Sequence, residues 1–246
     1  MPGKSKLDSE VCTAAAVEMA LQLKSNPEKA AFFPRFFKTG PGEYGEGIEF
    51  IGVIVPDQRK IAKQFHALPL NEVKTLLCSP LHECRLTSLF ILVNQFEKSK
   101  ADTVRKQIYD FYTQHSKLIN NWDLVDTTCH KIMGPYLKDR NRKILFQFAK
   151  SKCLWKNRIA IVTTFYFIRR NDLETTIEMA EILLDHPHDL IHKAVGWMLR
   201  ELGKQNKPML VLFLKQYGKT MPRTMLRYSI EKFPKSERAK ILAGKF

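Results

Sequence analysis

The 246-residue sequence lacks several features that would place it in well-defined classes of protein. No apolar run approaches the roughly 20 residues that a bilayer-spanning helix needs, so we expect no membrane segment. The first residues lead into Asp8 and Glu10 and not into an apolar stretch, which is unlike a secretory signal and indicates an intracellular protein. The P-loop, G-x-S-x-G and H-E-x-x-H motifs are also missing, which argues against the enzyme classes that carry them.

Cysteine is scarce, and its five residues form no C-x-x-C pair. An odd number without paired spacing argues against a disulfide framework and a zinc site, so we expect reduced, mostly buried thiols. Histidine offers one further arrangement, because His188 and His192 are four residues apart and His186 is nearby. No cysteine or carboxylate completes a metal site there. We interpret these histidines as residues at a helix start and expect neither a metal nor another cofactor.

Glycine is concentrated in one segment, residues 39–47, which contains the pattern G-x-G-x-x-G. We reject a dinucleotide-binding interpretation, because no strand precedes the segment and because Glu43 and Glu46 would repel a pyrophosphate. A mobile loop is the better interpretation.

Alternating β-branched runs are missing as well, whereas apolar residues recur at helical spacing along almost the whole chain. The predicted fold class is therefore all-α. A first helix is expected over Ser9 to Lys24, and a second begins after Asn26 with Pro27 at its first position and ends near Lys38. Further helix starts are expected near Val55, Ser79, Asp102, Asn121, Asn141, Leu154, Asp172, His188, Asn206, Met221 and Pro234.

Similar segments recur along this helical array, and each can be aligned on one polar residue. These residues are Arg85, Asp123, Arg158, Lys193 and Arg223. Their spacings of 38, 35, 35 and 30 are typical of a helical-pair repeat, and stacked repeats form a solenoid with a concave surface. We predict one domain over residues 1–246, in which residues 1–50 hold N-terminal helices and the glycine-rich loop and residues 51–246 hold the repeat array.

The net charge of +15 is unevenly distributed along the chain. Residues 1–139 carry 18 Lys+Arg against 16 Asp+Glu, whereas residues 140–246 carry 22 against 9. Such an excess favours a polyanionic partner, nucleic acid above all. The five aligned polar residues would line one side of a solenoid and could follow a phosphate backbone, although each one alone is better explained as a solvated residue in a first helical turn.

An aromatic and acidic stretch, residues 121–126, stands out in this basic chain. On a helix Trp122 and Asp126 would project side by side, because positions i and i+4 share a face. A core tryptophan beside a salt-bridged aspartate would give the same pattern. A second aromatic group, residues 165–167 with Trp155, is expected to pack in the core.

Four short segments occur in a specific order, at residues 50–59, 121–126, 155–160 and 194–201. Together they resemble the AlkD-type DNA alkylation repair proteins, which are DNA glycosylases that remove N3- and N7-alkylated purines. The resemblance covers most of the chain. It implies a right-handed solenoid of HEAT-like repeats with a concave basic face, acting as a monomer on duplex DNA that contains alkylated purines. For a bacterial source it implies a cytoplasmic, nucleoid-associated protein.

The resemblance also assigns functional residues. The family's aspartate and the tryptophan before it match Asp126 and Trp122, its arginine matches Arg158, and its second tryptophan matches Trp197. Family members often have two adjacent tryptophans, whereas this chain has Asn121 before Trp122, which leaves the catalytic pattern intact. The expected DNA contacts are Lys156, Arg158, Lys193, Arg200 and Arg223.

The chemistry of glycosidic cleavage fits these residues. Positive charge develops on the sugar as the base leaves, so the carboxylate of Asp126 would stabilise the transition state, by charge alone or by activating the attacking water. A cationic alkylpurine already carries its charge and needs no second acid. The indoles would contact the sugar or base, and Arg158 would hold a phosphate. The family recognises lesions without a deep pocket for a flipped base, and the sequence contains no pocket signature.

Two other functions fit the same sequence. A non-catalytic repeat scaffold that binds DNA or RNA through its charge would show steep salt dependence and no base release. An interaction protein whose concave face takes an acidic peptide would be distinguished from both by competition between that peptide and duplex DNA.

Overall fold

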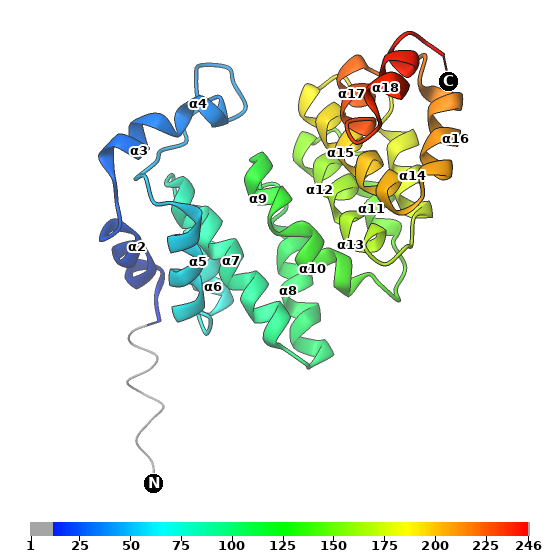
Figure 1. The fold of residues 1–246 in the computed structure, drawn as a ribbon. Coiled ribbons are helices and arrows are strands. Elements are labelled where there is room, and N and C mark those ends of the chain that lie inside the picture. The colour runs from blue at the N-terminus through cyan, green and yellow to red at the C-terminus, as the bar shows by residue number, and fades with distance from the viewer. Residues whose placement is uncertain (1–11, 246) are drawn as a thin grey trace. The chain divides into compact units, whose positions relative to one another are not determined.

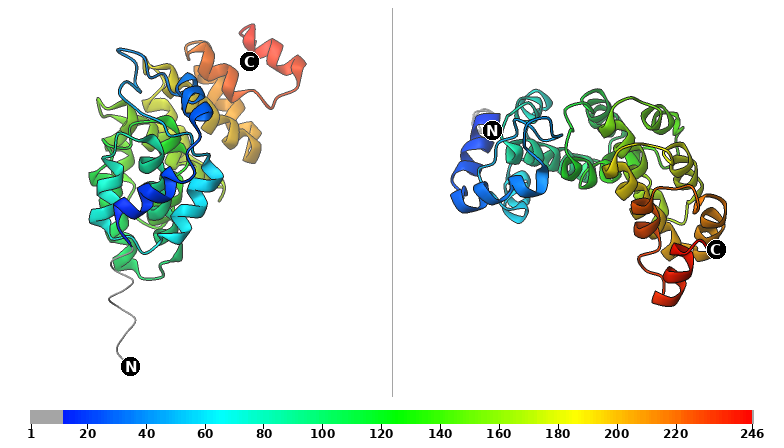
Figure 2. Two further views of the ribbon diagram at one scale, coloured as in Figure 1. Left: turned by 90° about the vertical axis from the view of Figure 1, so that its left-hand side faces the viewer. Right: turned by 90° about the horizontal axis from the view of Figure 1, so that it is seen from above.

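Helices are the only regular elements in residues 12–245, which the computed structural model describes (Figures 1 and 2). This confirms the predicted all-α fold class. No helix in this part of the chain is long and apolar enough to cross a lipid bilayer. The chain divides into two compact units, unit 1 up to Leu124 and unit 2 from Val125 onward.

Unit 1 is built around one long helix that packs against two shorter ones. Its helices are α2 (Ala14–Gln22), α3 (Pro27–Phe32), α4 (Pro34–Phe37), α5 (Val55–Gln64), α6 (Leu70–Leu77), α7 (His82–Lys98) and α8 (Asp102–Gln114). Helix α9 (Trp122–Asp126) begins in unit 1. Helix α7 contacts both α5 and α6 (Figure 1). Most of its residues are buried.

The start of the chain follows the predicted capping pattern. The Asn26 side chain accepts a hydrogen bond from the Lys29 backbone N–H at 2.9 Å, with Pro27 at the first position of α3, as expected. The first helix was expected over Ser9 to Lys24, whereas α2 begins at Ala14 behind the Thr13 cap. Residues 9–11 lie outside the described part of the chain.

The glycine-rich loop binds its own acidic side chains. Gly40 N–H donates to the Glu43 carboxylate at 3.0 Å, and Gly42 N–H donates to the Glu46 carboxylate at 2.9 Å. These carboxylates occupy N–H groups that a phosphate would otherwise contact, which agrees with the rejection of dinucleotide binding.

Unit 2 repeats the same kind of packing around helix α15. Its helices are α10 (Cys129–Tyr136), α11 (Lys143–Ala149), α12 (Leu154–Thr163), α13 (Phe165–Ile168), α14 (Glu174–Ile182), α15 (Asp189–Gln205), α16 (Lys207–Tyr217), α17 (Arg223–Ser229) and α18 (Lys235–Leu242). Helix α15 packs against α12, α16 and α17. His188 caps α15, as its interpretation as a helix-start residue predicted, and its Nδ1 accepts from the Leu190 N–H at 3.1 Å.

Contacts between residues about 32 positions apart reveal the repeat within unit 2. Gly134 lies against Tyr166, and Gly196 lies against Tyr228, so that an added Cβ would meet the tyrosine Cβ at 2.4 and 2.5 Å respectively. Side-chain bonds follow the same interval, from Asp126 to Arg158, from Arg142 to Asp172 and from Arg200 to Glu231. These contacts within unit 2 join residues 30 to 32 positions apart, at the lower end of the predicted spacings, and are typical of stacked helical pairs.

The aligned row of polar residues is not the solvent-facing row that the sequence predicted. Arg85, Asp123 and Arg158 are buried, with exposed fractions of 7%, 7% and 5%, whereas Arg223 is exposed. Arg85 donates to the Leu118 carbonyl oxygen at 2.7 Å. The prediction of a solvent-facing row was therefore wrong for Arg85, Asp123 and Arg158. Their side chains point toward neighbouring segments of the protein and form hydrogen bonds there, so they are not exposed to a phosphate.

The five cysteines are free thiols. Cys84 and Cys129 are buried, Cys12 and Cys153 are half-buried, and Cys78 is exposed. The prediction that most of the thiols are buried is therefore confirmed for Cys84 and Cys129 only. Burial raises the pKa of Cys84 to about 12 and also raises the pKa of Cys129.

Candidate functional site

The predicted catalytic aspartate and arginine form an ion pair in unit 2. Asp126 is the last residue of α9, and Arg158 lies on α12. Arg158 donates from Nε to Asp126 Oδ1 at 2.8 Å and from Nη2 to Oδ2 at 2.7 Å, while its Nη1 donates to the Leu190 carbonyl oxygen. The side chain of Arg158 is 6% exposed and that of Asp126 is 15% exposed. The pair is therefore a bidentate contact largely shielded from water, and the carboxylate keeps limited access to solvent.

This geometry differs from the predicted role of Arg158 at a DNA phosphate. All three guanidinium nitrogens donate to acceptors within the protein, two of them on the Asp126 carboxylate. A phosphate would have to displace at least one of these bonds and reach a buried side chain. The structure instead places Arg158 where it fixes the orientation of Asp126.

His130, four residues after Asp126, adds a neutral imidazole to the site. Burial lowers the pKa of His130 to about 4, aided by the charges of Lys131 and Arg169 and opposed by a hydrogen bond to the Asp126 backbone. The ring is therefore uncharged at neutral pH. It meets the ring of Phe165 edge-on, with centroids 5.3 Å apart.

Trp197 joins this cluster through Phe165. The Trp197 and Phe165 ring centroids are 5.7 Å apart at an angle of 41°, and the guanidinium of Arg169 lies 5.8 Å from the Phe165 centroid. Trp197 and Phe165 are both half-buried. Of the aromatic group that was expected to pack in the core, Trp155 and Phe167 are buried, but Phe165 is shared between Trp197 and His130.

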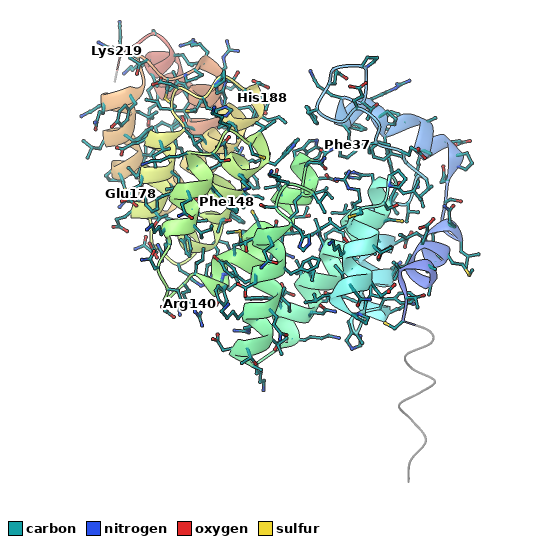
Figure 3. All side chains as sticks on the ribbon, turned by 180° about the vertical axis from the view of Figure 1, so that it is seen from behind. Phe37, Arg140, Phe148, Glu178, His188 and Lys219 are labelled. Carbon is teal, nitrogen blue, oxygen red and sulfur yellow. The ribbon has the colours of Figure 1, made fainter. Side chains whose placement is uncertain are left out.

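Trp122 is held by aromatic contacts inside unit 1. Its ring stacks on Phe37, which Figure 3 labels at the end of α4, with centroids 5.3 Å apart and planes inclined by 11°. Its indole N–H donates to the Phe36 carbonyl oxygen at 3.4 Å. The next residue, Asp123, is buried and accepts from His82 Nε2 at 2.7 Å. The two acidic residues of the stretch thus have different partners, histidine for Asp123 and arginine for Asp126.

The predicted DNA-contact residues of unit 2 differ in their availability. Arg200 is only 18% exposed and contacts the carboxylates of Glu201 and Glu231. Lys193 is 42% exposed and forms an i,i+4 pair with Asp189, with Nζ 2.7 Å from Oδ2. A phosphate would compete with glutamates at Arg200, whereas exposed pairs such as that of Lys193 are weak and readily exchanged.

The other two predicted contacts have no carboxylate partner among the described ion pairs. The ammonium group of Lys156 lies 5.2 Å from the ring centroid of Phe148, which Figure 3 labels. Arg223 is exposed and donates to the Leu242 carbonyl oxygen at 2.9 Å. No carboxylate in these contacts offsets the positive charge of either side chain, so both can attract an approaching anion.

The structure therefore brings together Asp126 and Arg158, and it joins Trp197 to a neighbouring aromatic cluster. Sequence reasoning missed His130 and Phe165. The only signal for His130 was its closeness to Asp126 in the sequence, because Asp126 ends α9 and His130 lies in the first turn of α10. Phe165 gave no such signal, because an aromatic residue at helical spacing is usually part of the core.

Comparison with known proteins supports one family. The family model described as DNA alkylation repair enzyme matches residues 17–233, which include every residue of the site. A solved structure titled "Predicted DNA alkylation repair enzyme from Enterococcus faecalis" is 17% identical, with a TM-score of 0.70, and the match covers 86% of this chain and 98% of that one. This likeness shows a shared fold. No curated protein matches the sequence. Because the family model spans most of the sequence, the chain belongs to the DNA alkylation repair enzyme family and has a role in DNA repair.

Proposed function

We propose that the protein is a DNA glycosylase that hydrolyses the N-glycosidic bond of cationic alkylated purines, such as 3-methyladenine and 7-methylguanine, in duplex DNA. The observation that carries the proposal is the Asp126 carboxylate, oriented by the bidentate contact with Arg158 and still 15% exposed. As the base leaves, positive charge develops on the sugar, and a fixed carboxylate needs no reorganisation to stabilise it. Asp126 supplies this charge and activates the attacking water.

Arg158 acts as a positioning residue in this proposal. Its two bonds fix the plane of the carboxylate, and its bond to the Leu190 carbonyl oxygen fixes the guanidinium in turn. The positive charge of Arg158 also weakens the negative potential of Asp126 at the sugar. The carboxylate is therefore held in a fixed orientation but stabilises a nearby cation less than an unpaired carboxylate would. A lysine could supply the charge but not the two parallel bonds.

The surroundings of Asp126 suit a cationic transition state. His130 is neutral above a pKa of about 4, so it adds no positive charge beside the sugar. Trp197 offers a half-buried π face to the sugar or to a cationic base, a contact of about 0.5 to 2 kcal/mol. Trp122 offers a second indole in unit 1, and these rings position the substrate more than they catalyse.

Binding to duplex DNA rests on the charge of unit 2. Residues 125–246 carry 24 Lys+Arg against 11 Asp+Glu, whereas residues 1–124 carry 16 against 14. Lys156 and Arg223 are the strongest candidates for phosphate contacts, with Lys193 next, because none of them is held by two carboxylates as Arg200 is. Binding through such contacts weakens steeply as salt rises.

One observation favours a second candidate, a DNA-binding scaffold without catalysis. Unit 2 contains another bidentate pair between repeats, Arg142 with Asp172, in which Nη1 donates to Oδ1 at 3.0 Å and Nη2 donates to Oδ2. If Asp126 and Arg158 only join repeats in the same way, Asp126 has no chemical role.

The matched pair of aspartates makes the test direct. Methylated duplex DNA is incubated with wild type, Asp126→Asn and Asp172→Asn, and free methylated bases and abasic sites are quantified. If the protein is a glycosylase, wild type and Asp172→Asn should release similar amounts of methylated base and leave as many abasic sites, whereas Asp126→Asn should release far less base in the same time. Retained DNA binding without base release from wild type would support the scaffold instead.

A further inference from the structure

Unit 1 contains a small pocket lined largely by rings, which we call the aromatic pocket. Its volume is about 220 Å³, and its lining comes from α4, the segment before α5, and the starts of α5, α7 and α9. Pockets that hold drug-sized ligands enclose roughly 300 to 1,000 Å³, so this one is small for a whole cofactor and suits a single side chain. Five of its lining residues are phenylalanine or tryptophan, namely Phe33, Phe36, Phe37, Phe50 and Trp122.

The rings of the aromatic pocket form a connected wall. Phe37, which Figure 3 labels, stacks on Trp122 with centroids 5.3 Å apart and lies 5.1 Å from Phe50. The imidazole of His82 extends this wall, with its centroid 4.8 Å from that of Phe37 and 5.1 Å from that of Phe50. The π faces of such rings attract cations, and planar guanidinium groups stack on them.

The backbone beside this wall is fixed by the fold. The Glu83 carboxylate accepts from the N–H groups of residues 51–53, at 2.8 Å for Gly52. These N–H groups are neutral, so they hold the carboxylate without cancelling its negative charge. Gly52 has φ of 83°, and an added Cβ would lie 2.0 Å from the Asn26 carbonyl oxygen. Only glycine fits there, so this side of the pocket is formed before any ligand arrives.

Two buried side chains of the lining each keep one acceptor atom without a donor. Gln58 and His82 are each 2% exposed, and neither Gln58 Oε1 nor His82 Nδ1 has a hydrogen-bond partner within residues 12–245. Gln58 Nε2 donates to the Val53 carbonyl oxygen and His82 Nε2 donates to the Asp123 carboxylate, both at 2.7 Å. With its proton on Nε2, a neutral imidazole presents Nδ1 as an acceptor. Buried acceptors without donors are uncommon, so the pocket suits a ligand that supplies N–H groups.

The charge of the aromatic pocket favours a cation. Glu83 and Asp123 are among its lining residues, and none of the described residues that line it is lysine or arginine, in a chain whose net charge is +15. An anion would meet two carboxylates, whereas a cation would meet both their charge and the π faces. The rest of the chain carries a large positive excess and repels cations, so the pocket is a local exception.

Exposed apolar side chains also belong to this lining. Phe36 is 55% exposed and Val55 is 40% exposed. Next to Phe36, outside the lining, the guanidinium of Arg35 lies 5.4 Å from the ring centroid of Phe32. A free small cation would leave Phe36 and Val55 in water, whereas an arginine within a polypeptide would bring neighbouring residues that cover them. Arginine is also one of the residues that most often anchor protein interfaces.

We propose that the aromatic pocket binds the guanidinium group of an arginine in a partner polypeptide. The guanidinium stacks on the wall of rings, and its N–H groups donate to Gln58 Oε1 and His82 Nδ1. The acidic lining residues supply the opposite charge, and apolar residues beside the arginine cover Phe36 and Val55. This interaction requires no DNA, so the inference does not depend on the proposed function.

Short peptides test the aromatic pocket directly. The probe is acetyl-Ala-Leu-Arg-Leu-Ala-amide, and the reference peptide has citrulline in place of arginine, which keeps the shape of the side chain but removes its charge. Titration calorimetry should show the arginine peptide binding about tenfold more tightly, a ratio within the range of cation–π contacts. Equal affinities of the two peptides, or no binding of the arginine peptide, would overturn the proposal.

A free guanidinium compound distinguishes a polypeptide partner from a small molecule. Acetyl-arginine amide carries the same charged group without the flanking leucines. It should bind at least about tenfold more weakly than the arginine peptide, because it leaves Phe36 and Val55 exposed. Equal affinity would show that the flanking residues make no contact and would overturn the assignment to a polypeptide.

Two valines provide matched variants. Val55 at the pocket and Val104 on α8 are each 40% exposed and lie in unit 1, so a charged residue at either position leaves the core intact and changes the net charge equally. Val55→Glu should strengthen binding of the arginine peptide about threefold, and Val55→Lys should weaken it about threefold, because the new charge lies near the guanidinium. Val104→Glu and Val104→Lys should leave the affinity nearly unchanged. Equal responses at the two positions would mean that the peptide binds elsewhere and would overturn the inference.

Discussion

Breaking the Asp126–Arg158 contact should destabilise unit 2 strongly, and Arg158→Met is the most informative substitution. Methionine has a similar length but no charge, so it leaves a carboxylate that is only 15% exposed without its partner. Removing one member of a buried pair costs about 3 to 5 kcal/mol. Because Asp126 retains some solvent contact, we expect a loss near the lower bound, about 3 kcal/mol.

Urea denaturation followed by circular dichroism measures this loss. A cost of about 3 kcal/mol moves the unfolding midpoint of unit 2 by about 1 to 2 M urea. The double variant with Asp126→Asn should lose less than the sum of the single variants, with a coupling energy of about 2 kcal/mol. Arg142→Met is the matched control, because Arg142 and Asp172 are 18% and 36% exposed, and it should cost only about 1 kcal/mol.

A coupling energy below about 0.5 kcal/mol, the value of an exposed surface pair, would refute this reasoning. The same result would remove the argument that Arg158 orients the carboxylate.

Four further predictions concern other parts of the molecule. Burial lowers the pKa of His130 to about 4 in the folded protein, against about 6.5 in the unfolded chain, so the neutral ring stabilises the fold fully above pH 6.5 and this stability is lost as the pH falls toward 4. His130→Gln should reduce the loss of unfolding free energy over this pH range by about 3 kcal/mol, measured by comparing unfolding curves of the variant and wild type at several pH values. Iodoacetamide at pH 8 should label Cys78 quickly but Cys84 and Cys129 only after unfolding, and peptide mass spectrometry that finds early labelling of Cys129 would contradict its burial. Gly196→Ala should cost roughly 2 kcal/mol or more, seen as a lower melting temperature, because the new Cβ would lie 2.5 Å from Tyr228 Cβ and 2.6 Å from the Met225 carbonyl oxygen. Lys156→Ala and Arg223→Ala should each weaken binding to any duplex and reduce the slope of affinity against salt by about one, and unchanged slopes would exclude these residues from the DNA contact.

Much of the helical arrangement was predictable because helix ends have local chemistry. Caps at Asn26, His188 and Asn206 begin α3, α15 and α16 where the sequence predicted a start. Helices α6, α10 and α13 were not separately predicted. The N-cap positions of α6 and α10 make no side-chain capping bond, and α13 follows α12 after a single residue.

Partners across repeats were only partly predictable. Asp126 and Arg158 are 32 residues apart, close to the repeat spacing, so the period could have indicated their pairing, whereas the sequence analysis assigned Arg158 to a DNA phosphate. The stack of Phe37 on Trp122 joins residues from separate elements outside that register, and no local pattern in the sequence predicts it. A pocket of about 220 Å³ in unit 1 is lined by this stack and by the backbone that Glu83 holds, which explains why the sequence predicted no pocket.

The central claim is that Asp126 acts chemically and does more than join two repeats. The rate of methylated-base release in a single turnover, with enzyme in excess over methylated duplex, tests it most directly. We expect Asp126→Asn to be slower than Asp172→Asn by about 100-fold to 1000-fold, the usual cost of removing one electrostatic group that stabilises a transition state. Equal rates for the two variants at equal DNA occupancy would contradict the claim.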